Sequence, residues 1–509
     1  MSYTMPAEIP LLSKSRFLAG LQCPKRLYLE CFHADLADKI SLAEQAKLDM
    51  GTRVGELGRD LYPGATLIAD PYFRHEDAVA TTVSALSDRS APAICEAAFL
   101  HDDVRIRVDI LARAANGELD LIEVKSGTSV KNEHVPDVAV QIYVLNGSGV
   151  PVRKGCLVHL NREYVYQGAD YELDELFQVE DITDDVNHLL PAIPSALEEM
   201  RRHLCQPEPP QVKPGRQCTS PYLCQFYGHC HVGDSEHPVT QLPRASQYLL
   251  DALDEAGIED IRDIPDGFPG LNATQRLVRD CVVGNRVHLD QELAKVLGQL
   301  ERPIHFLDFE TFNPALPLYV GTRPYQVIPF QWSCHILTGD GSLLHREFLH
   351  GGLDDPREAF ARSLLDALGG RGPIVTYSTF EATRIKELAR DLPHLAEPLG
   401  DLLEGRIVDL LQLVRRYCYH PEFHGSFSLK SVLPALVPGL GYGDLDISDG
   451  DQASLAYSEM IQPQTTSERR RWLRDCLLAY CKRDTEAMVR LSEALEQSKP
   501  QTYGRAPLQ

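Results

Sequence analysis

The sequence lacks any long apolar segment. Of its 509 residues, 43% are hydrophobic and 24% are charged, which is ordinary for a globular protein. No run approaches the roughly 20 apolar residues that a helix needs to cross a bilayer. The first residues, MSYTMPAEIPLLSKSRF, also lack the basic start, apolar core and cleavage site of a secretory signal. We therefore expect a cytoplasmic protein with no membrane partner.

The sequence is also short of positive charge. It has 50 Lys and Arg residues against 73 Asp and Glu residues, a formal net charge of -23. Proteins that bind nucleic acids usually show a basic footprint, so this sum argues at first against a polyanionic partner. The distribution of charge matters more than its total, because sites that gather carboxylates to hold cations add to the negative sum.

No internal repeat or low-complexity tract is visible, and the length allows two or three hydrophobic cores. Residues 1–235 begin with helix-like sequence, contain two strand-like runs and end in a Cys-rich stretch. Residues 236–300 have the apolar spacing of surface helices, which predicts a helical connector. Strands and helices alternate over 301–495, and this pattern favours an α/β fold. Residues 496–509 predict a flexible tail.

A first group of polar residues lies on a predicted hairpin. The runs VRIRVDILA and LDLIEVK flank Asn116-Gly117, which is a strong turn signal. Glu123 and Lys125 are two residues apart on the second strand and therefore share a face, and Asp109 lies on the first strand. Such a group holds a divalent cation beside a lysine that orients water, or it is an ordinary charged surface of a hairpin.

The wider pattern resembles the core of PD-(D/E)xK nucleases of the RecB type, a restriction-endonuclease-like α/β/α fold. The residues that carry this resemblance are Glu96, Asp109, Glu123, Lys125, Gln141 and Tyr143. Many relatives have a histidine ligand in the N-terminal helical region, where this chain reads GTRVGELG. The resemblance then implies metal binding by Glu96, Asp109, Glu123 and the carbonyl of Val124, with Glu56 as an alternative.

Three of the 13 cysteines form a second group. Cys218, Cys224 and Cys230 have five residues between successive members, and Cys23 lies far upstream in GLQCPKRLYLE. In a long cytosolic chain, clustered cysteines more often bind a metal than form disulfides. Four thiolates suit either an iron–sulfur cluster or zinc. Cys31 and Cys205 are alternative ligands.

The cysteine pattern resembles that of iron–sulfur RecB-type nucleases of CRISPR adaptation and recombinational repair. In those families one N-terminal and three C-terminal cysteines hold a [4Fe–4S] cluster, usually with the C-terminal spacing C-x2-C-x5-C. The resemblance implies that the cluster joins the two ends of the domain. Basic residues near these ends would then form one positive surface for a nucleic-acid strand: Lys14, Arg16, Lys25, Arg26, Arg201, Arg202, Lys213 and Arg216.

A third group of polar residues lies in the C-terminal region. Asp308 and Glu310 are two residues apart on an apolar strand, and a buried strand rarely carries two carboxylates without a cation or a basic partner. Tyr480 and Asp484 are four residues apart on a predicted helix and share a face. Between these pairs, Glu381 opens a helix that follows the strand IVTYS.

This ordered set resembles the DEDD exonucleases of the DnaQ-like, ribonuclease H-type fold. The resemblance implies that Asp308, Glu310 and Asp484 bind two Mg or Mn ions about 4 Å apart, and that Tyr480 orients the attacking water. Glu381 stands where the family usually has aspartate, and Asp409 is an alternative ligand or a helix cap.

Basic residues and aromatics interleave in RRYCYHPEFHGSFSLK, which contains Arg415, Arg416 and Lys430. This composition is typical of single-strand binding and equally of a loop with core aromatics. A further run, Arg469 to Arg474, precedes the last acidic motif and is a candidate for the edge of the same groove.

The sequence therefore predicts a metal-dependent nuclease that hydrolyses DNA phosphodiester bonds, single-stranded or at ends, with two candidate active sites. A nucleic-acid-binding scaffold with one or both sites inactive is the first alternative. An RNA-processing exonuclease is the second, because no residue in these motifs reads a 2′-hydroxyl.

Overall fold

The computed structural model describes residues 9–233 and 235–497. The predicted flexible tail lies outside the described residues from residue 498 onward. Within the described residues, 496–497 still belong to the last helix. No described helix is both long enough and apolar enough to cross a membrane.

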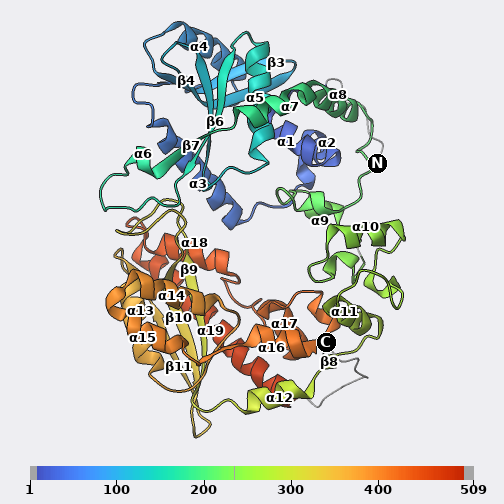
Figure 1. Cartoon of the computed structure of the whole chain (residues 1–509), viewed down its shortest axis with the longest axis vertical. Helices are drawn as coiled ribbons and strands as arrows, with labels where there is room; N and C mark the ends of the chain where they lie inside the picture. Colours follow the sequence, from blue (N-terminus) through green and yellow to red (C-terminus); the bar gives the residue numbers. More distant parts are fainter. Residues whose placement is uncertain (1–8, 234, 498–509) are drawn as a thin grey trace. The chain divides into compact units, whose positions relative to one another are not determined.

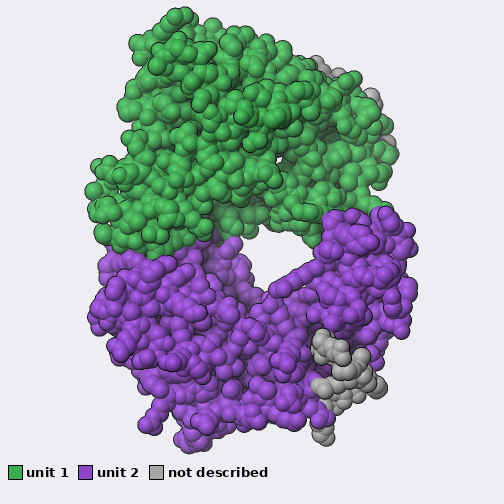
Figure 2. Space-filling view, in the orientation of Figure 1, with its two compact units in different colours: residues 1–232, 314–326 green, residues 233–313, 327–509 purple. Residues whose placement is uncertain are grey.

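The chain folds into two compact units of mixed α/β structure (Figure 2). Unit 1 comprises residues 1–232 and 314–326, and unit 2 comprises residues 233–313 and 327–509. The division falls three residues before the boundary predicted at residue 235. The region predicted as a separate connector belongs to unit 2, and the short segment 314–326 belongs to unit 1.

Unit 1 contains a seven-stranded sheet in the order β2-β3-β4-β5-β6-β7, with β1 paired to β4. Its strands are β1 (Leu12–Ser13), β2 (Thr66–Leu67), β3 (Ala93–His101), β4 (Val104–Arg113), β5 (Leu119–Lys125), β6 (Val152–Leu160) and β7 (Phe177–Asp181). Its helices are α1 (Lys14–Gln22), α2 (Pro24–Phe32), α3 (Leu42–Arg59), α4 (His75–Ser87), α5 (His134–Gly147), α6 (Leu173–Leu176), α7 (Thr183–Leu189), α8 (Ile193–Leu204) and α9 (Tyr227–Cys230).

The predicted hairpin is formed by β4 and β5, which pair in antiparallel register around Gly117 at a φ of 85°. The crossover through α5 then makes β6 parallel to β5. Helices α1, α4, α5 and α8 pack with one apolar cluster of the sheet, and α3 packs with a second cluster that includes Val54 and Val124. The sheet is therefore buried between two layers of helix (Figure 1).

Unit 2 contains a five-stranded mixed sheet in the order β11-β10-β9-β12-β13 and a two-stranded sheet of β8 and β14. The strands are β8 (His288–Leu289), β9 (Ile304–Phe312), β10 (Ile328–Leu337), β11 (Leu343–Leu349), β12 (Ile374–Thr376), β13 (Ile407–Asp409) and β14 (Cys418–Tyr419). The helices are α10 (Gln247–Glu255), α11 (Ala273–Val283), α12 (Gln291–Gly298), α13 (Pro356–Leu368), α14 (Phe380–Asp391), α15 (Ala396–Leu403), α16 (Leu410–Tyr417), α17 (Leu429–Leu436), α18 (Gly450–Met460) and α19 (Ser467–Gln497).

In the larger sheet of unit 2, β10 is antiparallel to both β9 and β11, whereas β12 and β13 run parallel to β9. Helices α13, α14 and α15 pack with the apolar residues of one face. Helices α18 and α19 contact β9 on the other face (Figure 1). The region predicted as an all-helical connector contains a short strand, β8, which pairs with β14. This pairing and the contacts of α12 with α16 and α19 explain why the connector belongs to unit 2.

Candidate functional site

The alternation of side chains along β9 gives unit 2 its acidic face. Leu307 and Phe309 pack into the apolar core with α13 and α14. The residues between and after them, Asp308 and Glu310, therefore point to the face that α18 and α19 cover. Glu310 is buried and Asp308 is half-buried. Both carboxylates have thus been brought out of bulk water, which is costly without a cation or a proton.

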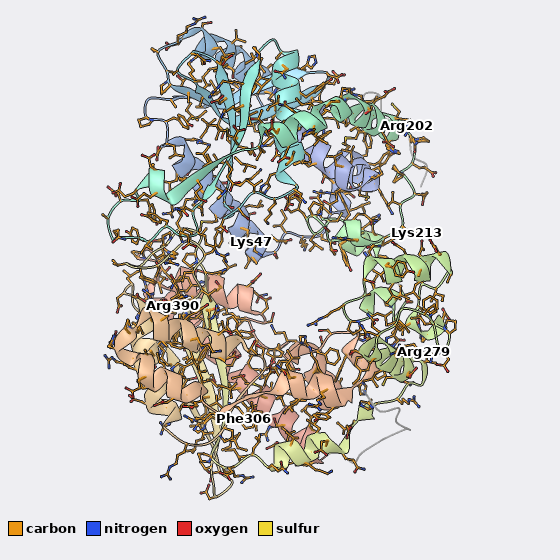
Figure 3. All side chains as sticks on the ribbon, in the orientation of Figure 1. Lys47, Arg202, Lys213, Arg279, Phe306 and Arg390 are labelled. Carbon is orange, nitrogen blue, oxygen red and sulfur yellow. The ribbon has the colours of Figure 1, made fainter. Side chains whose placement is uncertain are left out.

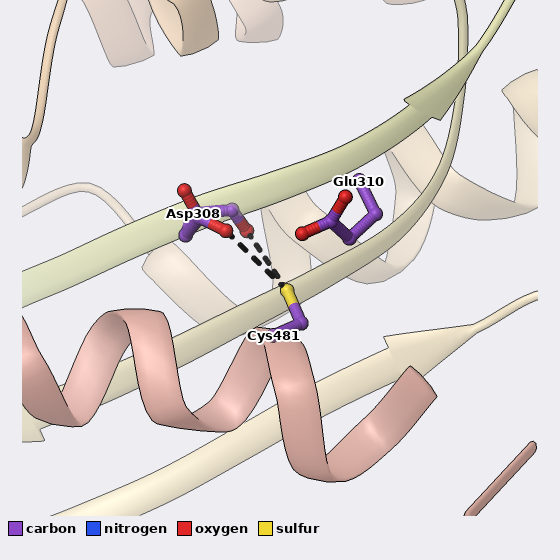
Figure 4. Close-up of side chains that lie close together, drawn as sticks. All are labelled: Asp308, Glu310 and Cys481. Carbon is purple, nitrogen blue, oxygen red and sulfur yellow. Dashed lines mark hydrogen bonds between the residues drawn. The ribbon is translucent and has the colours of Figure 1, made fainter. Parts of the chain in front are cut away.

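Helix α19 brings three more polar side chains to this face. Tyr480, Cys481 and Asp484 are all buried. The thiol of Cys481 lies 3.6 Å from Oδ2 of Asp308, and ligand atoms of Asp308, Glu310 and Cys481 all lie within 4.8 Å of one another (Figure 4). Among the described residues, this is the one group of three or more potential ligands that is so compact. Cys481 was not predicted, although it sits between the two predicted residues of the helix.

Two further residues in this site were not assigned to it from the sequence. The hydroxyl of Tyr442 donates to Oδ1 of Asp484 at 2.5 Å. Lys430, predicted as part of a basic and aromatic stretch, donates from Nζ to the Tyr480 hydroxyl at 3.2 Å and to the Ser448 carbonyl at 2.5 Å. Its ammonium also lies 5.2–5.3 Å from the ring centroids of Tyr442 and Tyr480. Lys430 is therefore held beside the acidic group.

Glu381 lies in the first turn of α14 and is 4% exposed. Its Oε2 atom has no hydrogen-bond partner among the described residues. Burial, together with the charge of Asp409, raises the pKa of Glu381 to about 8. Asp409 caps α16 by accepting from the Gln412 amide at 3.0 Å. Of the two roles considered for Asp409, the structure thus shows the helix cap, at a position where its charge acts on Glu381.

The other acids of this site also resist ionisation. Burial raises the pKa of Asp308 and of Glu310 well above the usual range, and the charge of Asp484 adds to the effect in both. Burial raises the pKa of Asp484 to about 6 although the hydrogen bond from Tyr442 opposes the change. Four carboxyl groups that share one buried region, with Lys430 as the nearby cation, leave a deficit of positive charge. A divalent cation fits this donor set.

The first predicted group, in unit 1, is organised differently. Lys125 contacts Glu123 at 2.7 Å and Asp137 at 2.6 Å. Lys14 contacts the same two acids, at 2.7 and 3.5 Å. Two ammonium groups therefore face two carboxylates, and Gln141 donates to the remaining oxygen of Glu123 at 2.8 Å. The charges within this group are balanced.

Lys14 enters this group because of the local structure around it. Leu12 and Ser13 pair with the start of β4, and the Ser13 hydroxyl caps α1, whose first residue is Lys14. The sequence placed Lys14 on a basic surface instead. Burial opposes the ionised form of Glu123, yet Lys14 and Lys125 lower the pKa of Glu123 below its ordinary value. Both lysines have raised pKa values, because Glu123 and Asp137 outweigh burial.

Two other predicted acids of unit 1, Asp109 and Glu96, lie beside this group. Asp109 accepts from the Val124 amide at 2.8 Å, and burial together with the charge of Glu123 raises the pKa of Asp109 to about 7. Glu96 forms an ion pair with Arg59 at 2.6 Å and has a φ of 58°. Glu96, Asp109 and Lys14 line one cavity. Glu96 thus already has a cationic partner.

Two residues predicted for this region lie away from it. The hydroxyl of Tyr143 donates to Asp102 at 2.9 Å, so it does not join Gln141 at the charged group, although the two residues share helix α5. Residues two apart on a helix point in different directions, which accounts for the separation. Glu56 is exposed on α3.

The four predicted cysteine ligands line one cavity. Cys23 lies between α1 and α2, and Cys218, Cys224 and Cys230 come from the segment that ends in α9. The side chain of Gln22 ties the two segments together by donating to the carbonyls of Gln217 and Tyr222, at 2.6 and 2.7 Å. Cys31 and Cys205 do not line the cavity.

Much of the predicted basic surface of unit 1 is neutralised. Arg26 pairs with Glu30, Arg201 with Asp102, and Arg202 with Glu199. Arg202 lies near the end of α8, and Lys213 lies in the segment that follows this helix (Figure 3). Lys25, Arg26 and Lys213 line the cysteine cavity.

The basic residues predicted for unit 2 are also mostly occupied. Arg415 and Arg416 lie over the rings of Phe427 and Tyr417. Arg469 pairs with Glu459 at 2.8 Å. Lys430 is the member of that prediction that reaches the acidic site.

Part of the acidic face of unit 2 lies in a segment that is similar to a family of domains. A family described as "Domain of unknown function (DUF2779)" matches residues 305–428. The matched residues include Asp308, Glu310 and Glu381, and they end before Lys430 and α19.

Two individual proteins are also similar to this chain. "Uncharacterized protein UU173" of Ureaplasma parvum serovar 3 is 23% identical over 233 residues, which are 40% of this chain and 33% of that protein. The chain thus spans about a third of the length of that relative. The structure titled "Crystal structure of SSO0001" has 14% sequence identity and a TM-score of 0.21, over 45% of this chain and 89% of that one. At that TM-score the likeness carries no information about the fold.

Proposed function

We propose that this chain is a divalent-metal-dependent nuclease whose principal active site is the acidic face of unit 2. The observation that carries the proposal is the convergence of buried Glu310, Glu381 and Asp484 with half-buried Asp308, all with raised pKa values. Perturbed carboxyl groups that converge with a tyrosine and a lysine are typical of a metal-assisted hydrolytic site. The mixed sheet and its two helical layers support a ribonuclease H-like fold of the DnaQ-like, DEDD type for unit 2.

In this proposal Asp308, Glu310 and Asp484 hold Mg or Mn ions, which supply charge neutralisation and activation of water at the scissile phosphate. Tyr480 orients the attacking water through its hydroxyl. Lys430 fixes that hydroxyl from 3.2 Å and adds positive charge beside the phosphate. The Tyr442 hydroxyl holds Asp484 from 2.5 Å and so sets the direction of its second oxygen. Glu381 completes the acidic wall at the start of α14.

The experiment compares Asp308→Asn with Asp401→Asn, the same chemical change at an exposed aspartate of α15 in the same unit. Labelled single-stranded DNA and RNA are incubated with each full-length variant and with Mn²⁺ or Mg²⁺. Loss of a metal ligand removes several kcal/mol of transition-state stabilisation, so Asp308→Asn is expected to lower the rate by about a thousandfold. An unchanged rate for Asp308→Asn, or an equal loss for Asp401→Asn, contradicts the proposal. The two polymers decide between DNA and RNA.

For unit 1 we propose the restriction-endonuclease-like fold of RecB-type proteins and a [4Fe–4S] cluster held by Cys23, Cys218, Cys224 and Cys230. Within the described residues, no three of these sulfur atoms lie within 4.8 Å of one another. Zinc with bonds of 2.3 Å requires sulfur atoms about 3.8 Å apart, so the wider spacing favours the larger cluster. Anaerobic purification followed by metal analysis tests this: about four irons per chain support the cluster. One zinc per chain contradicts it.

A binding role is the second candidate for unit 1, and the balanced charges of its acidic group favour it. Glu123 already has two ammonium partners, so a divalent cation must displace Lys14 before Glu123 can bind it. Glu123→Gln therefore distinguishes the two roles. If unit 1 cuts nucleic acid, this change removes a second nuclease activity that survives in Asp308→Asn. If unit 1 only binds, Asp308→Asn alone removes all hydrolysis.

A further inference from the structure

A cleft in unit 1 combines cationic, aromatic and acidic side chains. It has about 1190 Å³ of empty space, part of it open to solvent. One end is lined by Asp109, Glu96 and Lys14, which belong to or adjoin the charged group described above. The rest is lined by residues of β4 and of the segment between β2 and α4. None of the latter residues belongs to the basic surface that the sequence predicts.

Two arginines of β4 supply the positive charge of the cleft. Arg105 and Arg107 are two residues apart on the strand, so they project from the same face. Ile106 and Val108 alternate with them and are buried in the core. Neither arginine forms an ion pair with a carboxylate among the described residues. The Nε atoms of both, like that of Arg113 on the same strand, are buried without a hydrogen-bond acceptor there. The Arg107 guanidinium is steadied by the Asp70 carbonyl at 2.9 Å.

Other arginines of the same unit differ in this respect. Arg153 on β6 binds Asp120 through two hydrogen bonds of 2.5 and 2.9 Å. Arg59, at the acidic end of the cleft, is paired with Glu96. Arg105 and Arg107 therefore retain capacity for an external anion, whereas Arg153 and Arg59 are neutralised within the protein. This difference makes Arg153 a matched control.

An aromatic surface lies directly beside the arginines. Tyr72 lines the cleft and is 57% exposed, and the Arg105 guanidinium lies 5.3 Å from the centre of its ring. Phe73, the next residue, is 84% exposed. The two neighbouring rings therefore present aromatic surface to the solvent. Aromatic rings interleaved with cations are the combination that binds single-stranded nucleic acids, because bases stack on the rings while phosphates contact the cations.

We propose that this cleft is a binding track for single-stranded nucleic acid, with phosphates at Arg105 and Arg107 and a base stacked on Tyr72. The track leads along β4 towards Asp109. The proposal deepens the proposed function, on which it rests for the class of ligand. A duplex fits the site less well, since its bases are stacked inside and are not available to Tyr72.

Binding is measured as fluorescence anisotropy of a labelled oligothymidylate with the full-length protein in EDTA, so that no strand is cut. The variants are Arg105→Ala with Arg107→Ala, Tyr72→Ala, and Arg153→Ala as the control. The double arginine variant is expected to bind on the order of tenfold more weakly and to lower the slope of log K against log salt by about 1.4, since each phosphate contact contributes about 0.7 for single strands. Tyr72→Ala is expected to weaken binding about tenfold with an unchanged salt slope. Arg153→Ala is expected to change neither quantity.

A second double variant, Arg105→Lys with Arg107→Lys, keeps the charges and guards against a folding defect. It is expected to retain the salt slope of the original protein. An unchanged affinity and slope for the double alanine variant overturns the track, as does failure of the original protein to bind the oligomer. Equal affinity for a blunt duplex of the same length overturns the assignment to single strands.

The binding assay tests the track independently of the proposed nuclease activity, because it requires no hydrolysis. Loss of binding in the double alanine variant of a protein that cuts nothing supports the track and contradicts the nuclease. Hydrolysis that proceeds while the arginine and tyrosine variants bind normally supports the nuclease and overturns the track.

Discussion

The charged groups of the two units contain similar residues but differ in how their charges are balanced. In unit 1, Glu123 and Asp137 each contact Lys14 and Lys125 within 3.5 Å, and the pKa of Glu123 is lowered. In unit 2, Asp308 and Glu310 face other acids, and the pKa values of both are raised. A buried group with its own counter-ions needs no ligand, whereas a buried group of like charges needs protons or a cation.

The difference teaches that carboxylates on a sheet do not identify a metal site by themselves. In unit 2, Asp308 and Glu310 are paired on one strand, whereas in unit 1 Glu123 lies on β5 and Asp137 on α5. In unit 1 the two lysines offset Glu123 and Asp137, and the neighbouring Asp109 has a raised pKa, whereas all four acids of the unit 2 group have raised pKa values.

Removal of one acid from each group tests whether the two groups differ in charge balance. Glu123→Gln leaves the Lys14 and Lys125 ammonium groups short of a partner, so it is expected to destabilise unit 1 by about 3–5 kcal/mol. Glu310→Gln in metal-free protein removes one of several repelling charges, so it is expected to leave unit 2 unchanged or to stabilise it. Hydrogen exchange resolved by peptide follows β5 and β9 separately in the full chain. Equal destabilisation by the two changes would remove the distinction.

The pH dependence of unit 2 sharpens the same contrast. Its acids have raised pKa values, about 6 for Asp484 and about 8 for Glu381. A carboxyl group with a raised folded-state pKa favours folding most when it is protonated in both states. That contribution is lost as the pH rises from about 4 through the folded-state value. Metal-free unit 2 is therefore expected to lose stability between about pH 4 and pH 8.

Binding of a divalent metal ion is expected to restore the stability that unit 2 loses as the pH rises. At about a hundred times its dissociation constant, a ligand stabilises the folded state by about 2.7 kcal/mol. Because Mn²⁺ competes with protons for the carboxylates, its stabilisation of unit 2 should grow from acid to alkaline pH. Hydrogen exchange of β9 and α19 with and without Mn²⁺ measures the effect. Stabilisation by Mn²⁺ that is largest at pH 5 would be incompatible with the raised pKa values.

The smallest expected effect concerns the positioning of Tyr480 by Lys430. Lys430→Ala frees the Tyr480 hydroxyl from its hydrogen bond and is expected to lower kcat about tenfold, with little change in KM. Tyr480→Phe should have a similar effect. If Lys430 acts through Tyr480, the double variant is no worse than Tyr480→Phe alone. Losses that multiply in the double variant would assign Lys430 a role of its own. Lys386→Ala, on α14 of the same unit, serves as the control.

Local sequence patterns located the acids of the unit 2 group and Glu123 of the unit 1 group, but they did not point to Asp137 on α5. The two-residue spacing of Asp308 and Glu310 fixes their shared face wherever a strand forms, and the structure places that face against α19. The four-residue spacing of Tyr480 and Asp484 does the same for the helix. The alternation of Arg105 and Arg107 with apolar residues carried a comparable signal for the cleft, which the prediction overlooked in favour of basic residues near the cysteines.

The counter-charges, in contrast, were not predictable from spacing. Lys14 is 109 residues from Glu123, and Lys430 is 50 residues from Tyr480. The spacing of residues within one strand or helix does not predict which distant helix or loop a basic side chain contacts. Which acids are neutralised depends on these distant contacts, so the difference between the two groups emerges only from the tertiary structure.

Direct measurement of Mn²⁺ binding tests the central claim that the unit 2 acids require a divalent cation. Electron paramagnetic resonance reports free Mn²⁺ during titration of the full-length protein and of its Asp308→Asn and Glu123→Gln variants. The account predicts that tight binding is lost in Asp308→Asn and retained in Glu123→Gln. Retention in Asp308→Asn together with loss in Glu123→Gln would contradict it, since the metal would then belong to the group with balanced charges.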